Sequence, residues 1–174
     1  MNRALVLGLL VFGFNIPATA QAPTETGLVS ALQPLSFLIG DWDADPGQSG
    51  ETGAFSFKSA VQGHAIVRTN YANYPASAGK PPSRHDDLMV IAVENESLHA
   101  DYFDSEGHII RYHVQSPSSG QVTFVSEARS NEPRYRLRYA VNPDGTLSGR
   151  FDIAAPGKPD AFNPYLTWTA RRSR

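Results

Sequence analysis

Apolar and polar residues alternate along most of the chain, in short segments separated by Gly, Pro, Asn, Asp or Ser. A period of two is typical of antiparallel strands with one buried face, and these segments lack a sustained helical period. The pattern predicts ten strands, over residues 37–43, 53–61, 64–71, 87–93, 97–103, 109–115, 121–127, 134–141, 146–154 and 165–172. Short consecutive strands with tight turns predict an all-β fold, a single antiparallel up-and-down β-barrel.

Residues 98–114 contain the clearest single hairpin. Asp104 and Gly107 fit the first and last positions of a type I turn, so we expect a three-residue loop that sets the register. One face of this ribbon then carries a polar cluster of His99, Asp101, Arg111 and His113. The other face is apolar and aromatic, with Leu98, Ala100, Tyr102, Ile110, Tyr112 and Val114. We interpret the apolar face as the barrel interior, and the reverse orientation is the alternative.

A second hairpin is predicted over residues 134–154, with a three-residue loop at the turn Asn142-Pro143-Asp144-Gly145. One of its faces is apolar. The other face carries the charged residues Arg134, Arg136, Arg138, Arg150 and Asp152. We interpret this charged face as solvated outer surface, and an anion-binding site is the alternative.

Three segments outside the strands have their own predicted roles. Residues 23–30 are polar and without a period, which is typical of a flexible tether. Residues 31–38 favour one or two helical turns, and the spacing of Leu32, Leu35 and Leu38 suits a short helical plug over one end of the barrel. Residues 73–85 are too rich in Pro and Gly for a strand, so they predict a long loop, either a lid or portal or a plain surface excursion.

Residues 1–22 have the features of a secretory signal peptide. Arg3 gives a short positive region, residues 4–14 form an apolar run, and small residues follow at the cleavage spacing around Ala20 and Ala22. The run of 11 residues is too short to span about 30 Å of hydrocarbon as a helix, so we expect no membrane span in the mature chain. The expected protein is exported, periplasmic or extracellular, with one barrel domain over residues 31–174.

Composition narrows the range of partners. The chain has no cysteine, so neither a disulfide nor a lipid-attachment thiol is expected and the core alone holds the fold. Without Arg3, the mature chain carries 14 basic and 17 acidic residues, a net charge of −3. That balance argues against nucleic acid or an anionic membrane as the main partner. The sequence does not define the oligomeric state.

Motifs of the common enzyme classes are absent from the sequence, which has no Gly-x-Ser-x-Gly elbow, no phosphate-binding Gly loop and no His-Glu-x-x-His. We therefore assign no catalytic residue and no metal site, and a binding protein is favoured over an enzyme. A small isomerase or cyclase is the alternative, because a barrel can host such chemistry with one acid or base. That alternative, like a metal or acidic ligand, would use the polar cluster of the first hairpin turned inward.

The predicted inward face is rich in aromatic residues, including Tyr135 and Trp168. The expected ligand-binding residues are Trp42, Phe57, Tyr71, Met89, Tyr102, Tyr112, Tyr139, Phe151 and Tyr165. Ten strands enclose more volume than eight, which favours a cavity over a barrel filled by its own side chains. The sequence thus predicts an exported binding barrel for a small apolar or amphipathic molecule, whose polar group meets tyrosine hydroxyls.

Two stretches of the chain resemble the nitrobindin and lipocalin-like family of ten-stranded barrels. Residues 37–42, Phe-Leu-Ile-Gly-Asp-Trp, are similar to the family's opening Gly-x-Trp strand, and residues 153–159 with Pro164-Tyr165-Leu166 and Arg171 resemble its last two strands. The resemblance implies a barrel whose closed end packs Trp42 against Arg171. It also implies haem, ligated by a histidine at the position where this chain has Tyr165. We expect no stable haem complex here, and haem bound by Tyr165 is the alternative.

Overall fold

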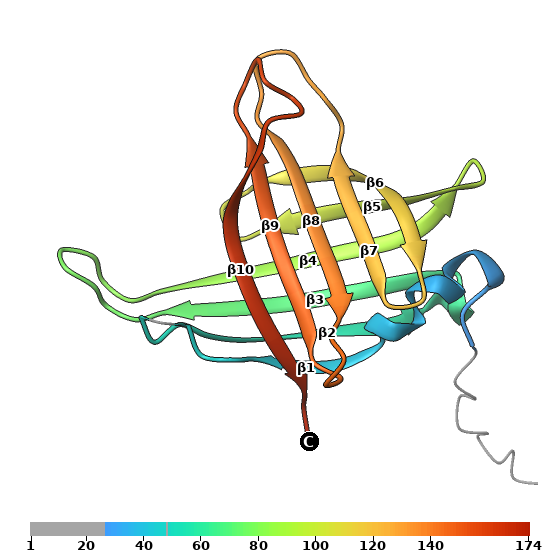
Figure 1. Ribbon diagram of the computed structural model, residues 1–174, viewed down its shortest axis with the longest axis horizontal. Helices are drawn as coiled ribbons and strands as arrows, with labels where there is room; N and C mark the ends of the chain where they lie inside the picture. The colour runs from blue at the N-terminus through green and yellow to red at the C-terminus, as the bar shows by residue number, and fades with distance from the viewer. Residues whose placement is uncertain (1–26, 48) are drawn as a thin grey trace, which may run out of the picture.

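The computed structural model describes residues 27–47 and 49–174. Its ten strands form one closed antiparallel barrel in which sequence neighbours pair and β1 closes against β10 (Figure 1). The strands are β1 (Gly40–Ala44), β2 (Thr52–Ala60), β3 (Ala65–Tyr74), β4 (Ser83–Glu94), β5 (Ser97–Asp104), β6 (Ile109–Ser118), β7 (Gln121–Ser126), β8 (Arg134–Val141), β9 (Leu147–Ala154) and β10 (Phe162–Arg172). The predicted up-and-down β-barrel is confirmed.

Both hairpins predicted from turn chemistry have the expected register. Asp101 of β5 pairs with Arg111 of β6, and the amide of Gly107 donates to the carbonyl of Asp104 across the turn. Strands β8 and β9 pair in the register that their turn predicts. Gly107 and Gly145 have φ values of 87° and 79°, the left-handed conformation that closes loops of this kind. Turn residues alone are sufficient to predict these two registers.

The strands fall into two groups whose directions cross in Figure 1. Strands β2–β5 run across the view, while β7–β10 run steeply through it. Buried side chains from both groups share one core, including Phe57 from β2, Phe124 from β7 and Tyr139 from β8. The core is therefore formed between strands that are distant in the sequence.

A 3₁₀ helix, η1 (Ser30–Leu38), covers one end of the barrel, which we call the closed end. Three residues per turn place every third side chain on the same side of such a helix. The predicted plug residues are fully buried on that side: Leu32, Leu35 and Leu38. Leu28 and Val29 also pack against this core, in contrast to the flexible tether expected there. The predicted leader lies outside the described residues.

Trp42 lies at the closed end, as expected, but its cationic partner is Arg172 rather than Arg171. The register of β1 and β10 pairs Trp42 with Arg172, whose guanidinium carbon lies 4.5 Å from the centroid of the indole ring. Arg171 belongs to the opposite face and forms an ion pair with Asp45. Gly40 has a φ of 138°, a backbone conformation that residues with a Cβ rarely adopt, and a Cβ here would also displace the Arg172 guanidinium, so glycine is favoured at this position.

Strands β3 and β4 extend well beyond their predicted ends. Asn73 pairs with Arg84 and Ala72 with His85, so the loop predicted over residues 73–85 shrinks to residues 75–82. The prediction failed because prolines and glycine are confined to the tip of this hairpin, while the flanking polar residues pair normally. The tip projects away from the barrel at the left of Figure 1.

Candidate functional site

The apolar face of the β5–β6 hairpin points into the barrel. Ala100 and Tyr112 are each 1% exposed, whereas the polar cluster lies on the outer face. There Arg111 forms an ion pair with Glu94, and the rings of His99 and His113 lie with their centroids 4.7 Å apart. His99, Asp101, Arg111 and His113 therefore do not face a molecule held inside the barrel, and the orientation with the polar cluster inward is excluded.

Aromatic side chains fill the part of the interior around Tyr139. The ring of Tyr139 packs edge-on against Phe57 with a centroid distance of 5.5 Å and against Trp168 at 5.9 Å. These are the distances of packed edge-to-face pairs. Five residues expected to bind a ligand are at most 1% exposed and belong to this core: Trp42, Phe57, Met89, Tyr112 and Tyr139. They stabilise the barrel instead of lining an accessible surface.

Tyr71 lies on the outer face of the barrel, contrary to the prediction. The register of β2 and β3 pairs the inward-facing Phe55 with Asn70, so Asn70 and Arg68 point inward and Tyr71 points outward. Tyr71 is 36% exposed, and the guanidinium carbon of Arg84 lies 4.4 Å from the centroid of its ring. The inward face of β3 is thus partly polar.

Arg68 and Asp87 form a buried ion pair inside the barrel, with side chains 6% and 4% exposed. The amide nitrogen of Asn70 donates a second hydrogen bond to Asp87 at 2.8 Å. Buried charges are tolerated when they are paired and hydrogen-bonded in this way. Burial raises the pKa of Tyr139 to about 12, although the nearby positive charge of Arg68 opposes the shift.

Two buried polar atoms near this ion pair have no hydrogen-bond partner among the described residues. They are the Nε of Arg68 and the hydroxyl of Tyr139. A buried donor without a partner costs about 1–3 kcal/mol. An acceptor oxygen from water, or from the polar end of a small molecule, is the group that satisfies such donors. Both atoms thus keep unused hydrogen-bonding capacity inside the barrel.

His85 of β4 connects the buried ion pair to the other end of the barrel, which we call the open end. Its Nε2 lies 3.3 Å from the carboxylate of Asp87 and 3.2 Å from the hydroxyl of Tyr102. Its Nδ1 lies 2.7 Å from a carboxylate oxygen of Glu106. The His85 side chain is 23% exposed and that of Glu106 is 49% exposed. A continuous network of polar groups, which we call the acidic network, therefore extends from Asp87 through His85 to Glu106 and solvent.

Asp104, at the end of β5, adds a third carboxylate to this network, after Asp87 and Glu106. Its Oδ1 accepts hydrogen bonds from the amides of Glu106 and His108 at 3.0 and 2.8 Å. Its Oδ2 lies 2.9 Å from Nδ1 of His108 and 3.4 Å from the hydroxyl of Tyr102. Burial opposes ionisation, but the hydrogen bonds from His108 outweigh it and lower the pKa of Asp104. Asp104 is therefore an ionised group held in a fixed orientation.

Acidic groups dominate the electrostatics of the open end. Burial raises the pKa of Tyr102 strongly, and the charges of Asp87 and Asp104 raise it further. Burial also raises the pKa of Tyr74, and neighbouring groups that include Glu106 add to the shift. The charges of the neighbouring carboxylates therefore add to the effect of burial, and both tyrosines stay neutral.

Partly exposed apolar and aromatic side chains lie beside this acidic network and form what we call the aromatic rim: Tyr135, Phe151, Tyr165 and Leu166. Tyr135 and Phe151 stack with ring centroids 5.8 Å apart, and Tyr165 packs edge-on against Phe151 at 6.2 Å. A β-bulge in β10 beside Leu166 interrupts the pairing, and Tyr165 and Leu166 are 66% and 43% exposed. Of the expected ligand-binding residues, Tyr102, Phe151 and Tyr165 therefore lie at the open end.

The sequence pattern does not single out Arg68, His85, Asp87 or Glu106. A signal for two of them is present, because counting back by twos from the inward Met89 reaches Asp87 and then His85. Assigning His85 to a loop removed it from that alternation. Glu106 lies in a turn, where no period applies, so only the folded structure places it beside His85.

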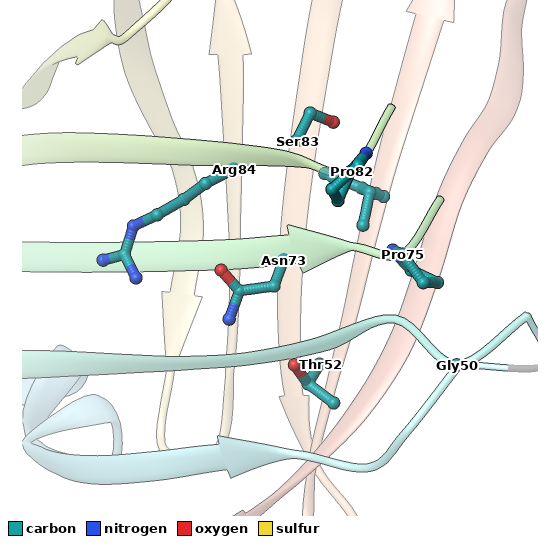
Figure 2. Close-up of a pocket in the computed structure, with 8 residues that line it drawn as sticks. Gly50, Thr52, Asn73, Pro75, Pro82, Ser83 and Arg84 are labelled. Atoms are coloured by element: carbon teal, nitrogen blue, oxygen red, sulfur yellow. The ribbon is translucent and has the colours of Figure 1, made fainter. Parts of the chain in front are cut away.

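A separate hollow of about 470 Å³ lies at the tip of the β3–β4 hairpin (Figure 2). Figure 2 shows Thr52, Asn73 and Arg84 on three neighbouring strands, with Pro75 and Pro82 beside them where two of these strands meet the loop. Its lining contains the titratable groups of Tyr74 and Arg84 and no carboxylate or histidine. The open end has carboxylates and a histidine next to exposed aromatic side chains, so we place the candidate site there.

No protein-family model matches the chain, and no curated protein matches it either. Among the described residues, no helix has the length and apolar character needed to cross a membrane.

Proposed function

We propose that this protein binds a small amphipathic molecule at the open end of its barrel. The aromatic rim contacts the apolar part of the molecule, and His85 and Tyr102 contact its polar part. One observation carries this proposal: inward side chains at the open end stay accessible to solvent, whereas those at the closed end are fully buried beneath η1.

Physical chemistry supports this assignment. Fully burying a large apolar side chain is worth about 1.5–3 kcal/mol, so covering the aromatic rim favours binding. Ligand sites typically combine such apolar lining with a few placed polar groups. The open end supplies both. The aromatic rim is the apolar lining, and the Tyr102 hydroxyl and Nε2 of His85, 3.2 Å apart, are the polar groups.

Titration with the neutral dye Nile red, whose fluorescence rises in apolar surroundings, tests this proposal. Phe151→Ala should weaken dye binding at least tenfold, because it removes the central ring of the aromatic rim. Phe103→Ala is the matched control, since Phe103 is 42% exposed but lies on the outer face of β5. Equal binding by both variants and the unaltered protein would exclude the open end as the binding site.

We further propose that the protein is exported and that residues 1–22 are removed as a leader. The positive Arg3, the apolar run and the small residues before Gln21 and Pro23 support this. Amino-terminal sequencing of periplasmic or secreted protein should begin at Gln21 or Pro23. A mature chain that keeps Met1 would contradict it.

We also propose that the protein is related to nitrobindin-like and lipocalin-like barrels. The closed ten-strand barrel supports it, as does the packing of Gly40, Trp42 and Arg172 at the closed end.

A further inference from the structure

We propose that His85, Asp104 and Glu106 bind one divalent first-row transition-metal cation at the open end of the barrel. The proposal does not depend on the binding of an amphipathic molecule. Its three side chains bring one nitrogen and two oxygen ligand atoms within 4.8 Å of one another.

The backbone holds these three side chains together. His85 lies on β4, Asp104 ends β5 and Glu106 lies in the turn that follows. The amide of Ser105 donates to the carbonyl of Asp86 at 2.9 Å, and the Ser105 hydroxyl accepts from the amide of Asp86 at 3.1 Å. The turn is thereby fixed against β4, so the ligand atoms are positioned before any cation arrives.

The orientation of the His85 ring is that of a metal ligand. Histidines that bind metals almost always donate their second ring N–H to a carboxylate, a carbonyl or water. Nε2 of His85 lies 3.3 Å from Asp87, which Arg68 and Asn70 hold in place from the opposite side. When Nε2 carries the proton, the lone pair of Nδ1 faces Glu106; when Nδ1 carries it, that N–H donates to Glu106, and a metal ion would replace this proton.

That arrangement places two electron-pair donors opposite each other. Nδ1 of His85 and the carboxylate oxygen of Glu106 are 2.7 Å apart. Two ligands about 2.1 Å from one metal ion lie about 3.0 Å apart at a right angle and about 4.2 Å apart on opposite sides. A cation between these atoms thus needs small shifts only, and the half-exposed Glu106 is free to make them.

The ligand types define the class of metal. Imidazole nitrogen favours Zn²⁺, Fe²⁺, Co²⁺ or Ni²⁺ over Ca²⁺ and Mg²⁺, and the two carboxylates suit the harder members such as Mn²⁺. Three protein ligands leave coordination positions open toward solvent, as in sites that bind water or a second ligand. The negative charges of Asp104 and Glu106 favour any divalent cation electrostatically.

Calorimetric titration of tag-free, chelator-treated protein with Zn²⁺ and with Mn²⁺ tests the proposal. We expect one cation per chain, with binding weakened at least tenfold in His85→Ala and in Glu106→Gln. Two matched controls on the outer face, His113→Ala and Glu94→Gln, should bind as the unaltered protein does, because these residues face away from the open end.

Circular dichroism and thermal melting check that each variant is folded. Glu106 lies in an exposed turn, so Glu106→Gln keeps the test decisive even when His85→Ala does not fold. Absence of binding at millimolar metal would overturn the proposal, because a proton alone would then bridge His85 and Glu106. Binding that is lost in His113→Ala and kept in Glu106→Gln would overturn it equally, since the cation would then bind outside the barrel.

Discussion

Arg68 and Asp87 are charged residues that the barrel buries among aromatic rings, and each depends on the other. Removing one partner of such a pair costs about 3–5 kcal/mol, because the remaining charge stays buried without compensation. Arg68→Met preserves much of the side-chain volume but leaves Asp87 without its cation. We expect the free energy of unfolding, measured by urea denaturation, to fall by that amount.

Lys58→Met is the matched control for this substitution. Lys58 and Asp41 form an ion pair whose side chains are 55% and 57% exposed, so its loss should cost at most about 1 kcal/mol. Similar losses for both variants would mean that the Arg68 pair is solvated in solution.

Asp152 organises the outer face of β8 and β9. Its side chain is 0% exposed and accepts hydrogen bonds from Arg136, Arg138 and Arg150 at 3.0, 3.0 and 2.6 Å. The sequence places these charges outside, which is correct, but the solvated surface expected there contains a fully buried carboxylate. Burial opposes ionisation, and the hydrogen bonds from Arg150 and Arg136 outweigh it and lower the pKa of Asp152.

This lowered pKa predicts a pH-dependent contribution to stability. The contribution is complete above the unfolded-state pKa of about 3.9 and is lost as the pH falls through the lower folded-state value. Asp152→Asn should therefore reduce the free energy of unfolding at pH 7 by roughly 1–3 kcal/mol. The difference between the two proteins should shrink below about pH 4, as urea denaturation at both pH values will measure. A difference that stays constant would contradict the prediction.

At the scale of elements, turn residues and the alternation of apolar and polar residues predict the hairpins. They do not predict the positions where a strand is extended or bulged. Asn95 and Glu96, with φ values of 49° and 65°, form the two-residue turn that pairs Met89 with Tyr102. Two features depend instead on tertiary pairing. One is the extension of β3 and β4 that brings in His85, and the other is the bulge in β10 that exposes Tyr165.

The closed end depends on Trp42, which joins three elements. Its indole N–H donates to the carbonyl of Leu38 in η1 at 2.9 Å, and its ring packs on Phe55 of β2 and on Arg172 of β10. Trp42→Ala should lower the free energy of unfolding by about 3–5 kcal/mol, as is usual for a large buried aromatic residue. Phe103→Ala, on the exposed outer face, should change it far less. Equal effects in thermal or urea unfolding would contradict the role of Trp42 in closing the barrel.

At the scale of the whole molecule, the two ends of the barrel differ in kind. The closed end is sealed by η1 and an aromatic core, whereas the open end joins an acidic network to the partly exposed aromatic rim. The sequence predicts the barrel and its plug from local patterns. It does not predict the acidic network, because Asp104 and Glu106 meet His85 only through the pairing of β4 with β5.

Intact mass measurement under non-denaturing conditions tests most directly whether the open end binds a small molecule. Protein purified from its producing cells, and the same protein incubated with Nile red, should each carry a discrete added mass that disappears on denaturation. Phe151→Ala should carry less of both. A chain that shows only its own mass in both samples would contradict the account.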